Sequence, residues 1–283
     1  MSRAATRSHF IRRGSTASST TTLTVSNANP VVTAVNQTPA PYAMNALVTV
    51  VANFTDAGKN DTHKTPPGGS CTVTWDDGSS PSTGAVTETP QSGTGSCSAT
   101  HTYLAAGVYT VTTTVCDDDG GCGSDITQVV VYDPSAGFIT GGGWITVDSG
   151  SLVGTTASGR ANFGFSSQYK KGATIPTGET EFNFQMGNFN FHSESYNWLV
   201  VSGYKAQYKG TGSVNGVSGY DFTLTAYDGD APSGGGVDKF RIRITKTNGG
   251  NVIFDNRLGV ASTDMDTALP EAISGGSIVI HKA

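Results

Sequence analysis

Charged residues, cysteines and long apolar runs are scarce in this chain of 283 residues. Charged residues make up only 14% of the sequence. No apolar run approaches the roughly 20 residues that a membrane-spanning helix requires. Residues 1–20 contain no hydrophobic segment longer than Phe10-Ile11. The sequence therefore predicts no membrane span and carries no recognisable signal peptide.

Glycine is abundant, with 37 residues, and it accompanies many serines and threonines and four cysteines. Strand-forming runs separated by Gly-rich turns predict an all-β protein, and the length favours two domains. Paired cysteines are typical of an oxidising compartment, which conflicts with the missing signal peptide. We therefore expect a secreted extracellular or cell-surface protein, of which this sequence is a truncated piece.

Basic and acidic residues are separated along the chain. Residues 1–34 carry four arginines and no acid, whereas residues 35–136 carry ten acids against two lysines. A basic start could bind nucleic acid, but only one aromatic residue, Phe10, accompanies the arginines. We therefore interpret residues 1–30 as a disordered leader followed by a remnant strand, and we expect no nucleic-acid partner.

Residues 20–29 repeat a pattern that recurs near residue 130. In both places a strand rich in threonine or valine runs into a turn with a proline, Pro30 or Pro134. The two copies lie about one immunoglobulin-sized domain apart. We expect residues 20–29 to be the last strand of a preceding repeat. This strand is either a linker or the element through which copies self-associate into filaments by strand donation.

Short strands with a period of two fill residues 31–134. Residues 71–75 and 109–115 alternate between apolar and polar side chains, which predicts one buried and one outer face for each strand. Another strand has an unbroken apolar row, consisting of Val48, Val50, Ala52 and Phe54. These patterns predict a β-sandwich.

Four motifs of this segment resemble those of a known family. In chain order they are Trp75-Asp76-Asp77-Gly78-Ser79, His101-Thr102-Tyr103, Gly107-Val108-Tyr109-Thr110-Val111 and Cys116-Asp117-Asp118-Asp119-Gly120. Their order and spacing resemble the PKD domain, an immunoglobulin-like repeat common in secreted bacterial surface proteins. The resemblance implies an immunoglobulin-like β-sandwich for residues 31–134, and the extra cysteines depart from the family pattern.

The four cysteines allow three disulfide pairings. Cys116 and Cys122 bracket a turn, so a disulfide between them would close a hairpin. Cys71 opens a strand and Cys97 precedes another, so these two could face each other across neighbouring strands. We predict the pairs 71–97 and 116–122. A zinc site is the alternative, but the spacings lack the CxxC pairs typical of structural zinc.

Carboxylates crowd three loops of the PKD-like segment. They are Asp117, Asp118 and Asp119 at one turn, Asp76 and Asp77 at a second, and Asp61 beside Asn60 at a third. Calcium prefers several oxygen ligands from such loops, and adjacent carboxylates repel one another without a cation. The resemblance adds that some PKD-like domains of secreted enzymes bind calcium. Calcium is thus the one cofactor that we expect, and ordinary solvated turns are the alternative.

The character of the sequence changes after Pro134. Nine strands are predicted, at residues 142–147, 159–165, 179–186, 196–201, 205–210, 219–227, 239–245, 251–255 and 276–281. They predict a second, larger β-sandwich or a jelly roll for residues 135–283. Five motifs resemble a C-terminal module found after PKD or other immunoglobulin-like repeats in large secreted bacterial proteins, and they lie at residues 137–145, 161–165, 169–172, 176–182 and 275–281. This resemblance carries over no catalytic residue.

One of these strands has two chemically different rows. Phe240, Ile242 and Ile244 form an apolar row that should face the core. The opposite row consists of Lys239, Arg241, Arg243 and Thr245. We expect this basic row to lie on the outside, where it keeps the domain soluble or grips an acidic polysaccharide.

Polysaccharide binding is the main ligand hypothesis for residues 135–283. Sandwich lectins use exposed aromatic faces with a few polar groups, and the candidates are Tyr196, Tyr204 and Tyr227. The Gly-rich acidic loop could hold a calcium ion at such a site through Asp228, Asp230 and Asp238.

His192 and Glu194 are the nearest approach to a catalytic pair, because residues two apart share a face of a strand. No GxSxG or HExxH motif accompanies them, so no catalytic residue is predicted. We expect a non-catalytic extracellular adhesion, matrix or surface-assembly protein that could bind polysaccharide or another surface protein. The alternatives are an accessory carbohydrate-binding region of a secreted hydrolase and a filament subunit that donates strand 20–29.

Overall fold

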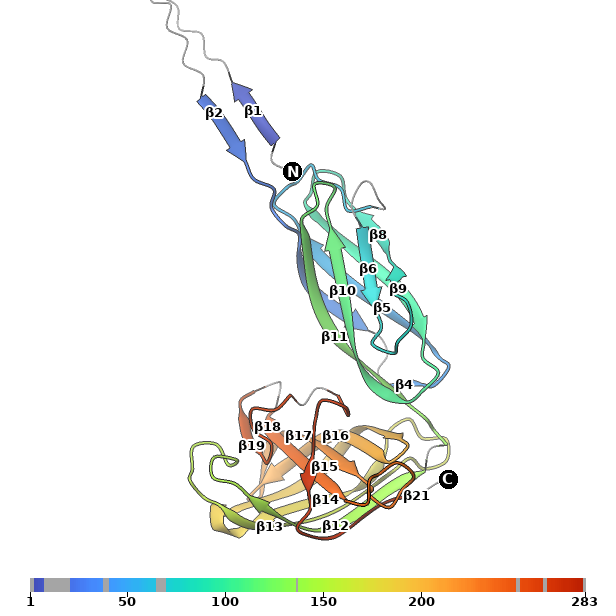
Figure 1. Cartoon of the computed structure of the whole chain (residues 1–283), viewed down its shortest axis with the longest axis vertical. Helices are drawn as coiled ribbons and strands as arrows, with labels where there is room; N and C mark the ends of the chain where they lie inside the picture. The colour runs from blue at the N-terminus through green and yellow to red at the C-terminus, as the bar shows by residue number, and fades with distance from the viewer. Residues whose placement is uncertain are drawn as a thin grey trace, which may run out of the picture. The chain divides into compact units, whose positions relative to one another are not determined.

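The computed structural model describes residues 3–7, 21–37, 41–64, 70–135, 137–247, 250–261 and 264–281. The chain divides into two compact units. Unit 1 comprises Met1–Thr38, Val48–His101 and Val111–Thr127, and unit 2 comprises Pro39–Leu47, Thr102–Thr110 and Gln128–Ala283. Within the described ranges the regular structure consists of β-strands and one 3-10 turn, which confirms the all-β class (Figure 1). None of these residues forms a helix long and apolar enough to cross a membrane.

The strand predicted within residues 20–29 is present as β2 (Thr21–Val25). It pairs antiparallel with β1 (Arg3–Arg7), so its partner belongs to the same chain. Residues 26–30 then lead without regular structure into β3 (Val31–Gln37). Residues 8–20 of the expected leader lie outside the described residues, and the boundaries at 30/31 and 134/135 stay predictions.

Two sheets form the immunoglobulin-like β-sandwich. The first has the order β3-β5-β9-β8, with β5 (Leu47–Thr55), β9 (Thr94–Thr102) and β8 (Ala85–Glu88). The second has the order β4-β11-β10-β6-β7, with β4 (Tyr42–Ala43), β11 (Cys122–Tyr132), β10 (Gly107–Cys116), β6 (Ser70–Thr74) and β7 (Ser82–Thr83). β10 and β11 each run through both units.

Alternating side chains build the core of unit 1, as the period of two predicts. The apolar row of β5 is buried in full and consists of Val48, Val50, Ala52 and Phe54. On β10 the buried row includes Val111, Thr113 and Val115, while Thr112 and Thr114 are half-buried. Both predicted rows are therefore confirmed.

Both predicted disulfides are present. Cys71 on β6 bonds to Cys97 on β9, with a Cα–Cα distance of 6.1 Å. This bond joins the two sheets of the sandwich, rather than neighbouring strands of one sheet as expected. Cys116 bonds to Cys122 across the β10–β11 turn, with a Cα–Cα distance of 4.1 Å. All four cysteines are thus used, and none remains for a zinc site.

A ten-stranded antiparallel sheet dominates unit 2, in the order β19-β18-β17-β16-β15-β14-β13-β12-β21, with β20 paired to β18. Its strands are β12 (Phe138–Val147), β13 (Gly159–Gln168), β14 (Thr177–Phe184), β15 (Phe189–Ser202), β16 (Lys205–Val214), β17 (Val217–Tyr227), β18 (Lys239–Lys246), β19 (Val252–Asp255), β20 (Glu271–Ala272) and β21 (Gly275–His281). The nine predicted strands are all present, and only the two-residue β20 was missed. The end of one predicted strand is instead the 3-10 turn η1 (Gln185–Gly187).

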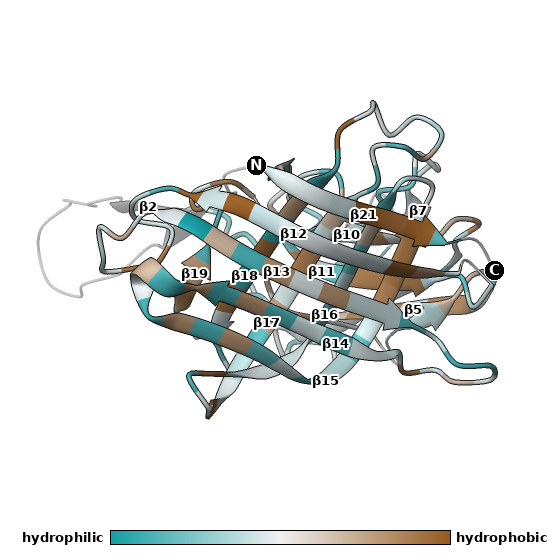
Figure 2. Ribbon diagram, turned by 90° about the horizontal axis from the view of Figure 1, so that it is seen from below, coloured by the Kyte–Doolittle hydropathy of each residue, from teal (hydrophilic) through white to brown (hydrophobic). Residues whose placement is uncertain are grey.

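This single sheet folds over its own core. The rings of Phe163 on β13 and Phe240 on β18 stack with centroids 4.1 Å apart, and those of Phe182 on β14 and Phe254 on β19 lie 4.7 Å apart. One half of the sheet therefore packs against the other, which gives a sandwich with meander connections. Figure 2 shows the strands β21, β12, β13, β14 and β15 side by side, with hydrophobic and hydrophilic residues alternating along them.

Arg241 on β18 contradicts the expected basic outer row, because its side chain is only 2% exposed. Its Nε and Nη2 atoms donate to the two carboxylate oxygens of Asp255, at 2.9 and 2.8 Å. It also donates to four main-chain carbonyls, those of Arg257, Val260, Ala261 and Ala268. The segment that follows β19 covers this position, which alternation along β18 could not reveal. Arg243 on the same row is 37% exposed, as expected.

Replacing Arg241 by alanine should destabilise unit 2 by about 3–5 kcal/mol, because the buried carboxylate of Asp255 loses its bidentate partner and keeps only the more distant Arg243 as a charged partner. The matched control is Arg243→Ala on the same strand, which should cost less than about 1 kcal/mol. Urea unfolding followed by the fluorescence of Trp144 and Trp198 measures both values. Equal losses in the two variants would contradict the role assigned to Arg241.

Candidate functional site

Three carboxylates from two separate loops of unit 1 meet at one point. They belong to Asp56 and Asp61, which follow β5, and to Asp117 in the β10–β11 turn. One oxygen of each lies within 4.8 Å of the others, and among the described residues this is the one group of three or more possible metal ligands. Asp56 and Asp117 are buried, and Asp61 is half-buried.

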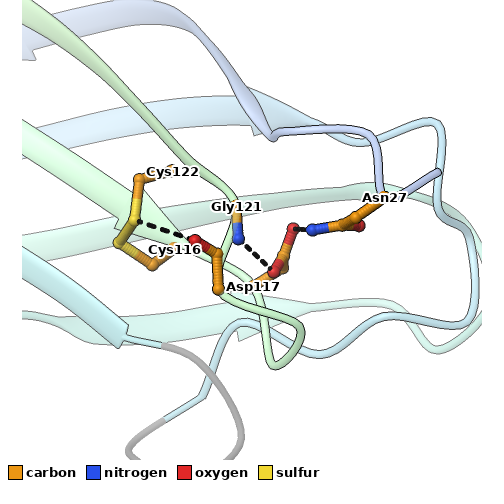
Figure 3. The surroundings of a disulfide bond; sticks show 6 residues. Asn27, Cys116, Asp117, Gly121 and Cys122 are labelled. Atoms are coloured by element: carbon orange, nitrogen blue, oxygen red, sulfur yellow. Dashed lines mark hydrogen bonds between the residues drawn. A yellow bond between two sulfur atoms is a disulfide. The ribbon is translucent and has the colours of Figure 1, made fainter. Parts of the chain in front are cut away.

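The two loops hold these carboxylates through their own main chain. The N–H of Gly58 donates to Oδ1 of Asp56 at 2.7 Å, and the N–H of Gly121 donates to Oδ1 of Asp117 at 2.8 Å. The Cys116–Cys122 disulfide closes the turn that carries Asp117 (Figure 3). Each loop therefore fixes its carboxylate before any ligand binds.

The segment before β3 also reaches this site. Nδ2 of Asn27 donates to Oδ2 of Asp117 at 2.8 Å (Figure 3). A Cβ atom on Gly121 would lie 2.7 Å from Oδ1 of Asn29 and 2.6 Å from Oδ2 of Asp117, so both side chains lie close to the main chain of this turn. The site thus joins three stretches of chain that are far apart in sequence.

The site has an excess of negative charge. Loss of solvation raises the pKa of Asp61 above its ordinary value, and the charges of Asp56, Asp118, Asp117 and Asp119 raise it further. A cation bound between the carboxylates would reverse this effect by favouring the ionised form. The possible ligands are carboxylate oxygens, a set that suits a hard cation such as Ca²⁺ better than zinc.

A buried histidine, His63, contacts the carboxylate of Asp56. Nε2 of His63 lies 2.9 Å from Oδ2 of Asp56, and its Nδ1 lies 3.0 Å from Oε2 of Glu88. The ring of Phe54 packs against the imidazole with centroids 4.5 Å apart. Each ring nitrogen of His63 therefore contacts a different carboxylate. Both oxygens of Asp56 therefore have a partner within unit 1, Oδ2 in His63 and Oδ1 in the N–H of Gly58.

The five carboxylates predicted as calcium ligands in this domain are not brought together. Asp117 lies at the site, whereas Oδ1 of Asp118 accepts the N–H of Thr62 at 2.9 Å. Asp119 is not part of the three-carboxylate group. Asp76 and Asp77 lie in another turn, where Asp77 accepts from Ser79 and pairs with His101. The sequence had marked Asp61 but missed Asp56, and the signal for it was an acid directly after a buried strand.

The three aspartates proposed as a second calcium site in unit 2 have a different arrangement. Oδ1 of Asp228 accepts the N–H groups of Asp230 and Ala231, and its Oδ2 accepts that of Ile280. Asp238 accepts the N–H groups of Gly229 and Ile278. These carboxylates tie the loop between β17 and β18 to β21. Calcium binding there stays a prediction without a cluster to support it.

The three tyrosines predicted to bind polysaccharide do not form an exposed platform. Tyr196 is buried, and its hydroxyl group lies 2.8 Å from Oγ1 of Thr180. Tyr227 is also buried and donates to the carbonyl of Met265 at 2.6 Å. Tyr204 is half-buried, with its ring edge-on to that of Tyr227. The strand pattern could not reveal that Tyr196 packs into the core or that the segment with Met265 covers Tyr227.

His192 and Glu194 do not act as a pair. Nδ1 of His192 lies 3.1 Å from Oε1 of Glu181 on β14, while Oγ of Ser218 donates to Glu194 at 2.5 Å. The pairing of β15 with β16 has a register shift between Ser193 and Ser195, on either side of Glu194. Each therefore has its own partner on a neighbouring strand.

Residues 22–130 match the PKD domain family. No curated protein matches the chain. Two crystal structures of the uncharacterized protein lmo2446 from Listeria monocytogenes EGD-e are similar at 10% identity and a TM-score of 0.28, and one of them is a complex with α- and β-D-glucose, magnesium and calcium. The cycloalternan-forming enzyme from Listeria monocytogenes, in complex with a pentasaccharide substrate, gives the same values. The matches cover 76–77% of this chain but only 18% of those proteins, and a TM-score this low assigns no shared fold.

Replacing His63 by leucine should lower the stability of unit 1 by about 3 kcal/mol, because the buried carboxylate of Asp56 loses its hydrogen-bond partner. His192→Leu is the matched control. His192 also contacts a carboxylate, but it is 52% exposed, so its loss should cost less than about 1 kcal/mol. Urea unfolding in chelator compares the two variants, and an equally small effect for His63→Leu would contradict its supporting role.

Proposed function

We propose that the PKD domain formed by residues 22–130 is a calcium-stabilised connector in a non-catalytic extracellular surface or matrix protein. The observation that carries this proposal is the convergence of Asp56, Asp61 and Asp117 beside Asn27. The PKD domain and the two disulfides support an extracellular location.

Calcium suits this site for three physical reasons. It takes six to eight oxygen ligands at about 2.3–2.6 Å and accepts irregular geometry, which loops provide more readily than the strict octahedron of magnesium. Its charge offsets the repulsion among three carboxylates, two of which are buried. Side-chain amides such as that of Asn29, whose Oδ1 lies beside Gly121, are further oxygen donors.

A cation at this point would fix the segment that precedes the sandwich. Asn27 and Asn29 belong to residues 26–30, which connect β2 to β3. Binding would therefore lower the freedom of this segment and transmit force or orientation along the chain. Adhesion and surface assembly both use connectors of this kind, and an accessory region of a secreted hydrolase would use it equally well.

Filament formation by donation of strand 20–29 is less favoured. β2 already pairs with β1 of the same chain over five residues. Donation to another copy would first have to break that pairing. We also propose that the chain has no catalytic activity of its own, because His192 and Glu194 are each held by a different neighbour.

Millimolar calcium should raise the melting temperature of unit 1 relative to chelator, by an amount equivalent to about 2.7 kcal/mol at a hundredfold excess over Kd. Asp61→Asn removes one ligand charge, so it should melt higher than the native protein in chelator and respond weakly to calcium. Differential scanning calorimetry measures both effects.

Asp118→Asn is the matched control, because it removes the same charge from an aspartate outside the three-carboxylate group. It should keep the calcium response. An unchanged melting temperature of the native protein between chelator and calcium, or an equal loss of response in Asp61→Asn and Asp118→Asn, would contradict the proposal.

A further inference from the structure

Two glycines on the outer face of the unit 2 sheet have no structural explanation. Gly142 on β12 and Gly164 on β13 are cross-strand partners. A Cβ atom on Gly164 would meet nothing within 4 Å, and one on Gly142 would meet only the carbonyl oxygen of Phe163, at 3.9 Å. Neither has a positive φ angle. Other side chains would fit both positions.

Neighbouring glycines show the contrast. A Cβ on Gly141 would lie 2.4 Å from the ring of Phe165, and one on Gly143 would lie 2.2 Å from the carbonyl oxygen of Gly275. Packing therefore requires glycine at positions 141 and 143. Glycine in a strand interior costs about 0.5–1 kcal/mol relative to alanine, and it often marks a place where a ligand approaches the backbone. Packing does not require glycine at positions 142 and 164, so both fit a place where a ligand approaches the backbone.

These glycines belong to a row that crosses five strands in register. From β21 to β15 the row consists of Ser277, Gly142, Gly164, Glu181 and His192. Its small members leave a trough across the sheet, which we call the glycine trough. A cavity of about 390 Å³ lies over it on β13 and β14. This volume falls in the range of about 300–1,000 Å³ typical of ligand sites.

Polar side chains form the walls of the glycine trough. Asn162, Ser166, Glu179, Glu181 and Asn183 line the cavity. Beside them, Trp144 is the cross-strand partner of Asn162 and is half-buried.

Contacts with neighbouring side chains hold the polar side chains of the trough in place. Arg160 donates from Nε to Oδ1 of Asn162 at 3.0 Å, and its guanidinium lies 4.7 Å from the centre of the Trp144 ring. On the other side His192 holds Glu181 at 3.1 Å. The trough is therefore positioned by its own side chains and sits on regular strands.

We propose that the glycine trough binds a polysaccharide chain without negative charge, lying across the strands. Amides and carboxylates at close spacing suit the hydroxyl groups of sugars, which both donate and accept hydrogen bonds. The bare backbone at Gly142 and Gly164 lets a sugar ring approach the sheet closely. Glu179 and Glu181 repel acidic polysaccharides, and the described residues that line the cavity include no Lys or Arg.

This proposal does not depend on the calcium site, because the trough lies wholly within unit 2 and the three carboxylates lie in unit 1. It assigns sugar binding to exposed residues instead of the buried tyrosines Tyr196 and Tyr227.

The test is binding of the full chain to insoluble cellulose and chitin, to soluble mannan and neutral β-glucan, and to anionic alginate, each with and without chelator. We expect saturable binding to at least one of the uncharged glycans, unchanged by chelator, and none to alginate. Gly164→Val should abolish this binding by filling the trough. Glu181→Gln should weaken it about tenfold, the effect of losing one hydrogen bond to a charged group.

Lys209→Val is the matched control, because it places the same side chain at an exposed strand position of β16 outside the trough. It should bind as the native protein does, and the melting temperatures of all variants establish that they are folded. No binding to any uncharged glycan would overturn the proposal. Preferential binding to alginate, or binding by folded Gly164→Val at native strength, would overturn it as well.

Discussion

Buried carboxylates and the groups that neutralise them organise the loops of both units. An isolated buried charge costs several kcal/mol, so each needs N–H donors, a cation or a paired base. Asp255 has the guanidinium of Arg241, and Asp228 and Asp238 have main-chain N–H groups from distant strands. At the end of unit 1 Asp56 has His63, but Asp61 and Asp117 add further negative charge around the same point. This excess of negative charge distinguishes the candidate cation site from carboxylates such as Asp228 and Asp238, which only hold loops in place.

The strands could be predicted from the sequence because each depends on a local pattern. Alternation along β5 identified the buried row from Val48 to Phe54, and all nine predicted strands of unit 2 exist. The disulfide pairs also followed from local placement, although Cys71 and Cys97 link two sheets instead of neighbouring strands. Side-chain period and turn chemistry therefore determine most of the fold.

Features that depend on contacts between distant segments could not be predicted in the same way. Arg241 has the sequence pattern of an exposed basic residue, but the segment after β19 covers it. Asp56 becomes a candidate ligand only because the β10–β11 turn brings Asp117 beside it. The glycine trough likewise depends on a register that places Gly142 beside Gly164, whereas Tyr196 packs into the core and Tyr227 is covered by the segment that contains Met265.

The most direct test of the account is a crystal structure of the protein grown with calcium, with the ion identified by its anomalous signal. The account predicts one ion between the carboxylates of Asp56, Asp61 and Asp117, at oxygen distances of about 2.3–2.6 Å. An ion held instead by Asp118 and Asp119, or by Asp76 and Asp77, would contradict it. The absence of any ion at the three carboxylates in saturating calcium would contradict it equally.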